Sequence, residues 1–418
     1  MTASQFSAIF VSLLLTNLVV KAWLAWRQLD HVAAHRAEVP PAFRERIGIA
    51  AHHKAADYTA AQVRFGLLGA LFDAALLLAF TVGGGIQTMY DLLSPLAVAS
   101  LLQGALLIAA VLLLQSLLEM PFDLYRTFRL ESRFGFNKTT PRLYFTDTMK
   151  NLLLGAVLGL PLLFAVLWLM QGMGEGWWLY VWLLWVMFNL FLLFIYPSYI
   201  APLFNKFEPL QDETTRTRIE ALLKRCGFAA SGLFVMDGSK RSTHGNAYFT
   251  GFGKTKRIVF FDTLLQRLTP SEMDAVLAHE LGHFKRRHVL QRIAVIFAVS
   301  LGFLWLLAQL MQAGWFYQGL GVEAQTTATA LLLFIMALPV FTFALHPLAS
   351  FWSRRHEFEA DAYAAAQTDA SALVSALVKL YQDNAKTLTP DPVYAAFYES
   401  HPPAPIRIAH LQRLGGHS

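Results

Sequence analysis

The chain has 418 residues, a length that would allow two or three soluble domains. Its composition excludes that class of protein, because 56% of the residues are hydrophobic and only 15% are charged, against about a quarter in a soluble domain. The formal net charge is +6 and the mean hydropathy is +0.44. Repeated apolar stretches near twenty residues long therefore predict a mainly α-helical, polytopic membrane protein.

Seven stretches are long and apolar enough to cross a bilayer. They cover residues 6–26, 65–83, 97–120, 152–170, 177–196, 289–311 and 327–351. The first has no basic segment before it and no small-residue cleavage site, so we interpret it as a retained span and not a signal peptide. Asp73 lies within the second span, and because a carboxylate is costly in lipid, it predicts a polar interior between the helices.

The distribution of basic residues predicts how the chain is oriented. The short connections 84–95, 171–176 and 313–326 contain no Lys or Arg, whereas segments 27–64, 121–150, 198–288 and 352–418 carry nearly all of them. By the positive-inside rule, the N-terminus lies outside and the C-terminus in the cytosol, at the inner membrane if the source is bacterial. These loops explain the net positive charge without a nucleic-acid partner.

The lone Cys226 excludes an internal disulfide and is expected to be a buried packing residue.

The predicted spans divide the chain into four parts. Residues 1–204 hold the first five spans, 205–288 form a cytosolic insertion, 289–351 hold the last two spans, and 352–418 form a cytosolic C-terminal segment. Within the insertion we expect a helix at 213–224, extended segments at 233–236, 246–252 and 257–261, a loop at 237–242 and a turn at 253–256. The result would be a small α+β unit whose sheet has a free edge, onto which a peptide can add as a further strand.

The last part of this insertion carries a metal-binding motif. Thr269 and Glu272 form a capping box with Pro270 at the first helical position, which predicts a helix starting ten residues before His279. On that helix His279 and His283 lie one turn apart and can bind one Zn²⁺, with Glu280 beside them as general base. This is the His-Glu-x-x-His arrangement of zinc hydrolases.

A catalytic zinc usually has three protein ligands, so a third is needed. The metzincin pattern is excluded because the required position holds Val289. The candidate is Glu357: it follows the seventh span by about six residues, as His283 precedes the sixth, so both lie about 9 Å from the membrane edge at 1.5 Å per residue. Asp361, one turn after Glu357, is expected to orient a ligand histidine, whereas Glu359 points away.

Two other histidine positions invite the same interpretation. His52 and His53 are adjacent and would point apart on a helix, so we expect them on the solvated surface. His356 precedes Glu357 and faces elsewhere, and we expect a surface role for it as well.

At this point the chain resembles the type I CAAX prenyl proteases, which are seven-span zinc metallopeptidases. The resemblance covers nearly the whole chain and includes residues 133–140 (RFGFNKTT), 196–210 (YPSYIAPLFNKFEPL), 239–265, the zinc helix, 353–361 (SRRHEFEAD), and His401-Pro402-Pro403 followed by Arg407. It implies helices that enclose a large water-filled chamber within the membrane, with the zinc site at its cytosolic end.

The resemblance also implies roles for residues that the sequence alone leaves open. Asn246, Ala247 and Tyr248 would form the edge that binds the substrate backbone, and His401 and Arg407 would lie near the zinc and stabilise the oxyanion. Without the resemblance, His401 is equally well interpreted as a loop residue before two prolines.

We therefore predict a membrane-embedded zinc metalloendopeptidase that binds one Zn²⁺ per chain and cleaves near the C-terminus of protein or peptide tails, prenylated or not. Its partners would be such a tail and the lipid bilayer, and no oligomer is implied. Two alternatives remain: a membrane quality-control metalloprotease of the heat-shock type, and a transporter or scaffold whose zinc is structural. The former has fewer spans, and the latter needs a fourth ligand.

Overall fold

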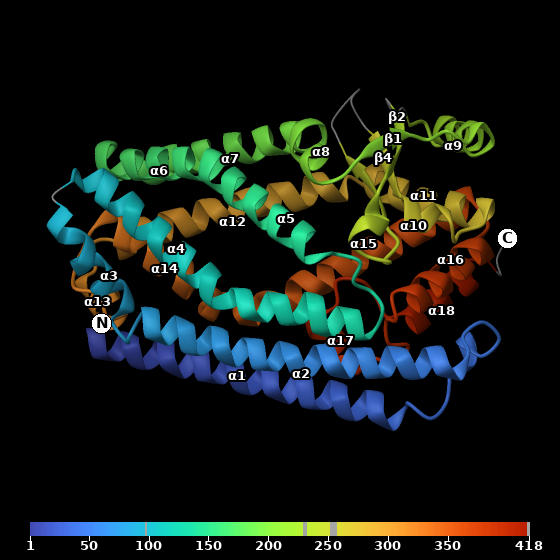
Figure 1. Ribbon diagram of the computed structural model, residues 1–418, viewed down its shortest axis with the longest axis horizontal. Coiled ribbons are helices and arrows are strands. Elements are labelled where there is room, and N and C mark those ends of the chain that lie inside the picture. Colours follow the sequence, from blue (N-terminus) through green and yellow to red (C-terminus); the bar gives the residue numbers. More distant parts are fainter. Residues whose placement is uncertain (97, 229–231, 251–256, 416–418) are drawn as a thin grey trace.

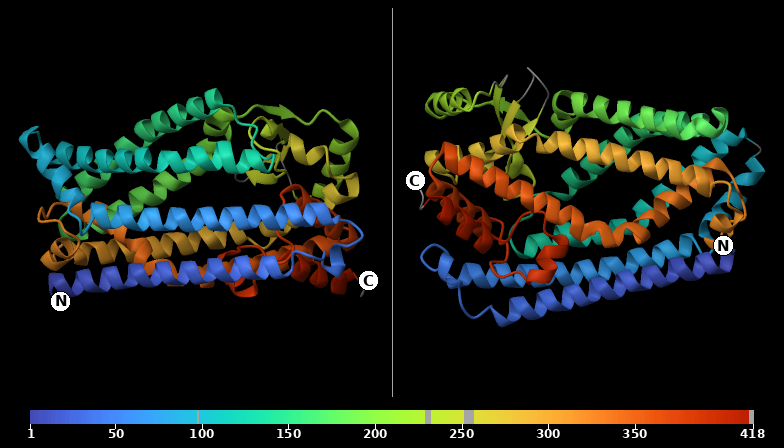
Figure 2. Two further views of the ribbon diagram at one scale, coloured as in Figure 1. Left: turned by 60° about the horizontal axis from the view of Figure 1, so that its bottom comes forward. Right: turned by 180° about the vertical axis from the view of Figure 1, so that it is seen from behind.

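The computed structural model describes residues 1–418 except 97, 229–231, 251–256 and 416–418. Long helices run side by side along the longest axis of the molecule, and the small sheet lies at one end (Figure 1). Helices α1 and α2 form one side of the molecule and α6 and α7 the opposite side, as the views in Figure 2 also show. We call the end that carries the sheet the sheet end.

Seven helical segments are long and apolar enough to cross a membrane, which confirms the predicted number of spans. They are α1 (Ala3–Ala34), α2 (Ile49–Phe80), α4 with a following π turn (Ser100–Glu131), α5 to α6 (Pro141–Gly172), α7 to α8 (Gly174–Phe204), α12 (His288–Leu310) and α14 to α15 (Thr327–Gln367). Most have about 32 residues, or about 48 Å at 1.5 Å per residue, which exceeds a hydrocarbon core of about 30 Å. Their ends therefore project beyond the membrane and build the sheet end.

Four of these spans are compound, and turns separate or follow their individual helices. Their bounds are α4 Ser100–Tyr125, α5 Pro141–Leu154, α6 Leu160–Gly172, α7 Trp177–Ile195, α8 Ala201–Phe204, α14 Thr327–Thr342 and α15 His346–Gln367. The remaining helices are α3 Gly85–Leu93, α9 Glu213–Arg225, α10 Asp262–Leu265, α11 Pro270–Lys285, α13 Gly314–Gly319, α16 Ala370–Asp383, α17 Pro392–Tyr398 and α18 Ala404–Gly415.

The prolines at the end of the fifth span do not stop the helix, contrary to what their positions suggest. The segment Tyr196–Ile200 forms a π turn that contains Pro197, and α8 continues the span to Phe204. A π turn accommodates a proline because its wider hydrogen-bonding pattern tolerates the missing N–H. A second π turn, Arg126–Glu131, follows α4 and adds a basic segment to the end of that span.

The insertion has the expected α+β character. Its sheet has four strands in the order β1-β2-β4-β3, with β1 Phe207–Pro209, β2 Gly232–Met236, β3 Ala247–Thr250 and β4 Arg257–Phe261. Strand β2 is parallel to β4, and β3 pairs antiparallel with β4, so β3 is an edge strand among the described residues. The predicted turn at 253–256, and residues 251 and 252, lie outside the described residues.

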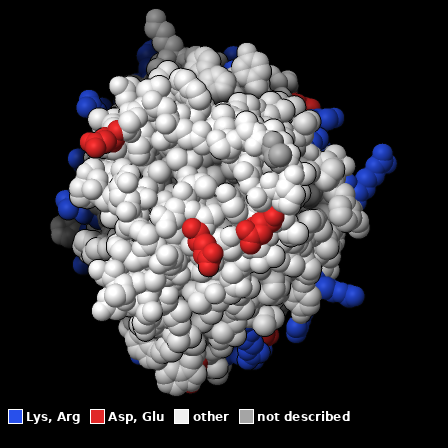
Figure 3. Space-filling view, turned by 90° about the vertical axis from the view of Figure 1, so that its left-hand side faces the viewer, with Lys and Arg blue, Asp and Glu red and all other residues white. Residues whose placement is uncertain are grey.

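The end opposite the sheet is closed and carries few basic side chains. Buried apolar side chains of α1, α4, α6, α13 and α14 pack together there, among them Phe10, Tyr317 and Leu333. Figure 3 shows this end as an almost uncharged surface with acidic residues near its centre and basic residues only towards its rim. The basic residues thus gather towards the sheet end, as the loop composition predicts.

Two local expectations about histidines were wrong. His52 is 1% exposed and its Nε2 lies 2.9 Å from the carbonyl oxygen of His35, so the start of α2 packs against the end of α1 and not against solvent. His356 is 4% exposed. Helices α2 and α15, which carry these histidines, extend beyond their apolar segments. Packing of the extended ends against neighbouring segments buries residues that the sequence pattern alone places at the surface.

The first span is tied to the last part of the chain. Arg27 donates from Nε and Nη2 to the Asp391 carboxylate at 3.1 and 2.8 Å, and the neighbouring Gln28 Oε1 accepts from the Asp391 backbone N–H at 2.7 Å. This contact fixes α17, and with it the segment that carries His401, against α1.

Candidate active site

Helix α11 begins with the capping box that the sequence predicts. The Thr269 hydroxyl accepts from the Glu272 backbone N–H, and the Glu272 carboxylate accepts from the Thr269 backbone N–H at 2.7 Å. The same carboxylate accepts from Lys379 Nζ and Ser375 Oγ of α16, both at 2.6 Å. Burial alone would raise the pKa of Glu272, but these hydrogen bonds outweigh it and lower the pKa to about 2. The start of the helix is thereby fixed to α16.

Helix α11 packs closely against α15, and small residues make this possible. A Cβ atom at Gly282 would lie 2.9 Å from Cα and 3.1 Å from the carbonyl oxygen of Ala360, closer than such atoms approach in proteins. Ala278 and Ala360 are fully buried at the same contact. The backbones of the two helices therefore come near enough for side chains of both to meet at one point.

That point is where His279, His283 and Glu357 converge. The Nε2 atoms of the two histidines are 3.3 Å apart, and the Glu357 carboxylate oxygens lie 3.5 Å from His279 Nε2 and 3.4 Å from His283 Nε2. Tetrahedral ligands at about 2.0–2.1 Å from a zinc ion are separated by about 3.3–3.4 Å, so the two imidazole nitrogens and the Glu357 carboxylate suit such an ion. They are the one group of three metal-binding side chains within ligand distance among the described residues.

The other nitrogen of His279 is held from behind. His279 Nδ1 donates to Asp361 Oδ1 at 2.9 Å, which leaves Nε2 free to bind a metal. Burial by itself lowers the pKa of His279, but Asp361 and Glu357 outweigh it and raise the pKa to about 9. The carboxylates that attract a proton there would attract a metal cation equally.

Arg407 of α18 completes this arrangement and is itself buried. It donates from Nε to Asp361 Oδ2 at 2.8 Å and from Nη2 to Asp361 Oδ1, and its Nη1 lies 3.4 Å from Glu357 Oε2. Burial lowers the pKa of Arg407, but the two carboxylates outweigh it and the pKa is raised. The guanidinium is therefore fully engaged with groups behind the metal site.

His283 has a support that the sequence analysis missed. His283 Nδ1 lies 3.0 Å from His288 Nδ1, and His288 Nε2 lies 3.1 Å from Glu359 Oε2. The ring of His356 stacks on His288 with centroids 3.9 Å apart. His288 is thus no metal ligand, but it connects a ligand to a carboxylate. The short spacing of five residues between His283 and His288 was visible in the sequence. Only the break between α11 and α12, however, brings the two rings together.

Two further predicted residues lie on the accessible side of the site. Glu280 is partly buried, and no described side chain holds its carboxylate by a hydrogen bond or an ion pair. His401 is largely exposed, and its Nδ1 lies 2.8 Å from Glu357 Oε2. These two groups, unlike Asp361 and Arg407, are accessible to an incoming molecule.

The predicted substrate-binding residues lie at the sheet edge. Asn246 immediately precedes β3, its Oδ1 accepts from the Ala247 backbone N–H at 2.8 Å, and its carbonyl accepts from Phe261 N–H at 3.0 Å. Ala247 faces the apolar core of the insertion. Tyr248 lies on the other face, with its hydroxyl 3.9 Å from Met236 Sδ.

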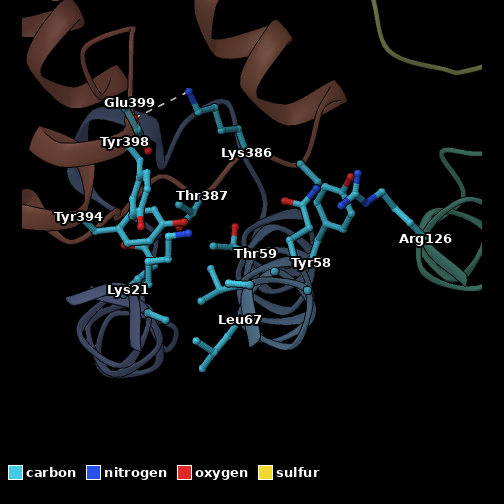
Figure 4. Close-up of a pocket in the computed structure, with 18 of the residues that line it drawn as sticks. Lys21, Tyr58, Thr59, Leu67, Arg126, Lys386, Thr387, Tyr394, Tyr398 and Glu399 are labelled. Carbon is cyan, nitrogen blue, oxygen red and sulfur yellow. Dashed lines mark ion pairs between the residues drawn. The ribbon is translucent and has the colours of Figure 1, made fainter. Parts of the chain in front are cut away.

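A space of about 760 Å³ lies between α1, α2 and the segment that follows α16. It is lined by side chains of both helices, by the segment 384–387 and by Tyr394, Tyr398 and Glu399 of α17 and the residue after it. Figure 4 shows Lys21, Tyr394 and Tyr398 on one side of this space and Tyr58 and Arg126 on the other. Asp73 also lines it, as its position in a span predicted. We call this space the chamber.

Comparisons with known proteins agree with this site. Residues 28–206 match the family model of the CAAX prenyl protease N-terminal region with five membrane helices, and residues 209–414 match peptidase family M48. The chain is 33% identical to a CAAX prenyl protease 1 homolog of Caenorhabditis elegans over 97% of this chain and 98% of that one. It is 32% identical to CAAX prenyl protease 1 of Saccharomyces cerevisiae over 94% of this chain and 92% of that one.

The fold is also similar to that of a solved structure. The crystal structure of Ste24p of S. mikatae superposes with a TM-score of 0.91 at 29% identity, covering 97% of this chain and 99% of that one. The match therefore extends over nearly the whole length of both chains. On these grounds the chain belongs to the CAAX prenyl protease 1 family of M48 peptidases and is a metalloendopeptidase embedded in a membrane.

Proposed function

We propose that this protein is a zinc endopeptidase that cleaves near the C-terminus of prenylated protein tails, at the cytosolic face of the membrane. The observation that carries the proposal is the convergence of His279, His283 and Glu357 at the separations of zinc ligands. The names of the relatives support the substrate class, since they are CAAX prenyl proteases. The basic residues at the sheet end support the orientation.

In this mechanism His279, His283 and Glu357 hold the metal, and Asp361, with Arg407 behind it, fixes the orientation of His279. When bound, zinc would supply Lewis-acid chemistry, which makes a water more acidic and a peptide carbonyl more electrophilic. Glu280 takes the proton of the attacking water and then donates it to the leaving amine. His401, the exposed imidazole beside Glu357, is assigned to stabilise the negative charge that develops on the carbonyl oxygen.

Substrate positioning is assigned to the sheet edge. A peptide that adds to β3 beside Asn246, Ala247 and Tyr248 would hydrogen-bond through its backbone, so its extended chain would pass the metal site. Such binding recognises the peptide backbone more than its side chains. The part of the tail beyond the cleaved bond would enter the chamber.

Glu280→Gln tests the proposal directly. The amide keeps the size of the side chain but cannot accept the proton, so we expect peptidase activity to fall by about 10²–10⁴-fold with zinc content unchanged. Activity is measured on a farnesylated C-terminal peptide, with release of the terminal residues followed by mass spectrometry. The exposed Glu220→Gln on α9 is the matched control. Full activity in Glu280→Gln with zinc bound contradicts the assignment.

The same assay separates the two alternatives. A quality-control protease would cleave the unmodified peptide as fast as the farnesylated one, so we expect a preference for the farnesylated form. A structural zinc would need a fourth protein ligand, whereas three donors converge among the described residues. A preparation that binds zinc tightly but cleaves neither peptide would favour that class.

A further inference from the structure

A second cleft, with a volume of about 1060 Å³, lies between α2 and the π turn that follows α4. Helix α2 separates it from the chamber. Ala61, Arg64, Phe65 and Leu68 line the cleft, whereas residues 59, 62, 63 and 66 line the chamber. Because residues at spacings of three and four share one helix face, the two spaces lie against different faces of α2. The cleft is thus distinct from the chamber.

The cleft has a strongly basic end. Arg64, Arg129 and Arg133 line it, no acidic residue does, and none of the three arginines forms an ion pair among the described residues. The acidic groups nearby are already engaged. Asp57 pairs with Arg36 at 3.0 Å, and Glu131 accepts from the Tyr58 hydroxyl at 2.7 Å.

The rest of the cleft is apolar and aromatic. Phe65 lies between two aromatic rings of α4, with centroids 5.2 Å from Tyr125 and 6.0 Å from Phe122. Leu68, which is 55% exposed, extends this surface along α2. These apolar side chains lie within spans, while Arg129 lies at the sheet end of its span and Arg133 just beyond it.

The basic and the apolar parts of the cleft are separated along both helices. Leu68 follows Arg64 by four residues, or about 6 Å, and Phe122 precedes Arg129 by seven, or about 10 Å. Both helices change from basic to apolar in the direction that leads away from the sheet end. A ligand that fits both would carry an anionic group at the membrane surface and hydrocarbon towards the membrane interior.

We propose that this cleft binds an anionic phospholipid of the leaflet at the sheet end. Its phosphate is held by the guanidinium groups of Arg64, Arg129 and Arg133, which suit phosphate because they donate in a planar fork, and its acyl chain lies on Phe65, Leu68 and Phe122. A zwitterionic lipid fits less well, since its ammonium group would face three cations, with no carboxylate among the residues that line the cleft.

The occupant would contact the structure that borders the chamber. Phe134 of the cleft lies 4.9 Å, between ring centroids, from Tyr58, which lines the chamber and lies 4.8 Å from Phe136. Phe136 in turn stacks at 4.6 Å on His244, another chamber residue close to β3. A lipid in the cleft would thus stabilise the wall that supports the substrate edge.

The test measures lipid retention by the full-length protein in detergent. Delipidated protein is given equal amounts of dioleoyl phosphatidylglycerol and dioleoyl phosphatidylcholine, and bound lipid is counted by native mass spectrometry. We expect at least a fivefold preference for phosphatidylglycerol. The triple variant Arg64→Gln/Arg129→Gln/Arg133→Gln should lose this preference, while Arg46→Gln/Lys240→Gln/Arg286→Gln, which removes three exposed cations outside the cleft, should keep it.

Further arms identify what is bound. Leu68→Asn leaves all three arginines in place and should weaken retention of the lipid, which a purely electrostatic contact would not show. Glycerol 3-phosphate should not displace the lipid, and neither should a farnesylated peptide. Displacement by either compound, or an unchanged preference in the cleft triple variant, overturns the proposal. Monodisperse elution and unchanged zinc content of each variant serve as the folding check.

Discussion

Asp361 orients the metal site without belonging to the ligands. It accepts from His279 Nδ1 on one side and from the Arg407 guanidinium on the other, and it is fully buried. We expect Asp361→Asn to weaken zinc binding by about 10–100-fold, because the amide supplies only one acceptor oxygen and leaves the Arg407 charge poorly compensated. Competition with a chromophoric chelator measures the affinity, with Glu220→Gln as control. Wild-type affinity in Asp361→Asn would contradict this role.

Glu272 makes the anchoring of α11 dependent on pH. Its pKa is lowered to about 2 in the folded protein, against about 4.5 in an unfolded chain, so the carboxylate contributes stability that is fully present above pH 4.5. This contribution is lost as the pH falls from 4.5 towards 2. Glu272→Gln should therefore have a lower thermal midpoint than the wild type in detergent at pH 7. The difference between the two midpoints should become smaller near pH 3. A constant difference over that range would argue against the ion pair.

Single residues also show where sequence reasoning reaches its limit. The ligands could be predicted because helix periodicity relates His279 to His283, and equal depth relates both to Glu357. His288 and His356 could not, because their contact depends on the break at Arg287, which has a positive φ of 59°, and on packing across two helices. The contacts of Arg407 could not be predicted from residue spacing either, since 46 residues separate it from Asp361.

At the scale of elements, the contact between α11 and α15 brings the ligands together. Gly282 lies against the Ala360 backbone, so the Cβ of Gly282→Ala would force the two helices apart or strain them, at a cost of about 1–3 kcal/mol. We expect this variant to fold but to bind zinc more weakly, because Glu357 moves relative to the histidines. The cobalt-substituted protein reports this change through its visible spectrum. Gly302→Ala, where a Cβ meets no atom within 4 Å, is the matched control.

The elements themselves were largely predictable, and their ends were not. Apolar length located all seven spans, and the strand-forming residue types located β2 and β4. The sequence pattern underestimated the spans, except α12, by about ten residues, because the other helices continue beyond the lipid where protein segments cover them. Pro161 and Pro197 lie beside or within π turns, and the spans that contain them are continuous.

For the whole molecule, the unequal distribution of charge predicts an orientation that can be measured. The chain has a single cysteine, Cys226, which is 8% exposed and so gives a low labelling background. In right-side-out vesicles, an impermeant maleimide should label Glu323→Cys, which lies in the connection before α14, but not Glu220→Cys on α9. Both should react after permeabilisation. The opposite pattern would place the metal site outside.

The contact of Arg27 and Gln28 with Asp391 has a consequence for how activity first arises during synthesis. The partners are 364 and 363 residues apart, so α17 can meet α1 only after nearly the whole chain has been made. A chain cut short before this point lacks Asp391 and also His401. On the proposed mechanism such a chain would cleave its neighbours slowly even with all three metal-binding side chains in place. Synthesis and proteolysis are thus coupled, because residues made last complete the site on which cleavage depends.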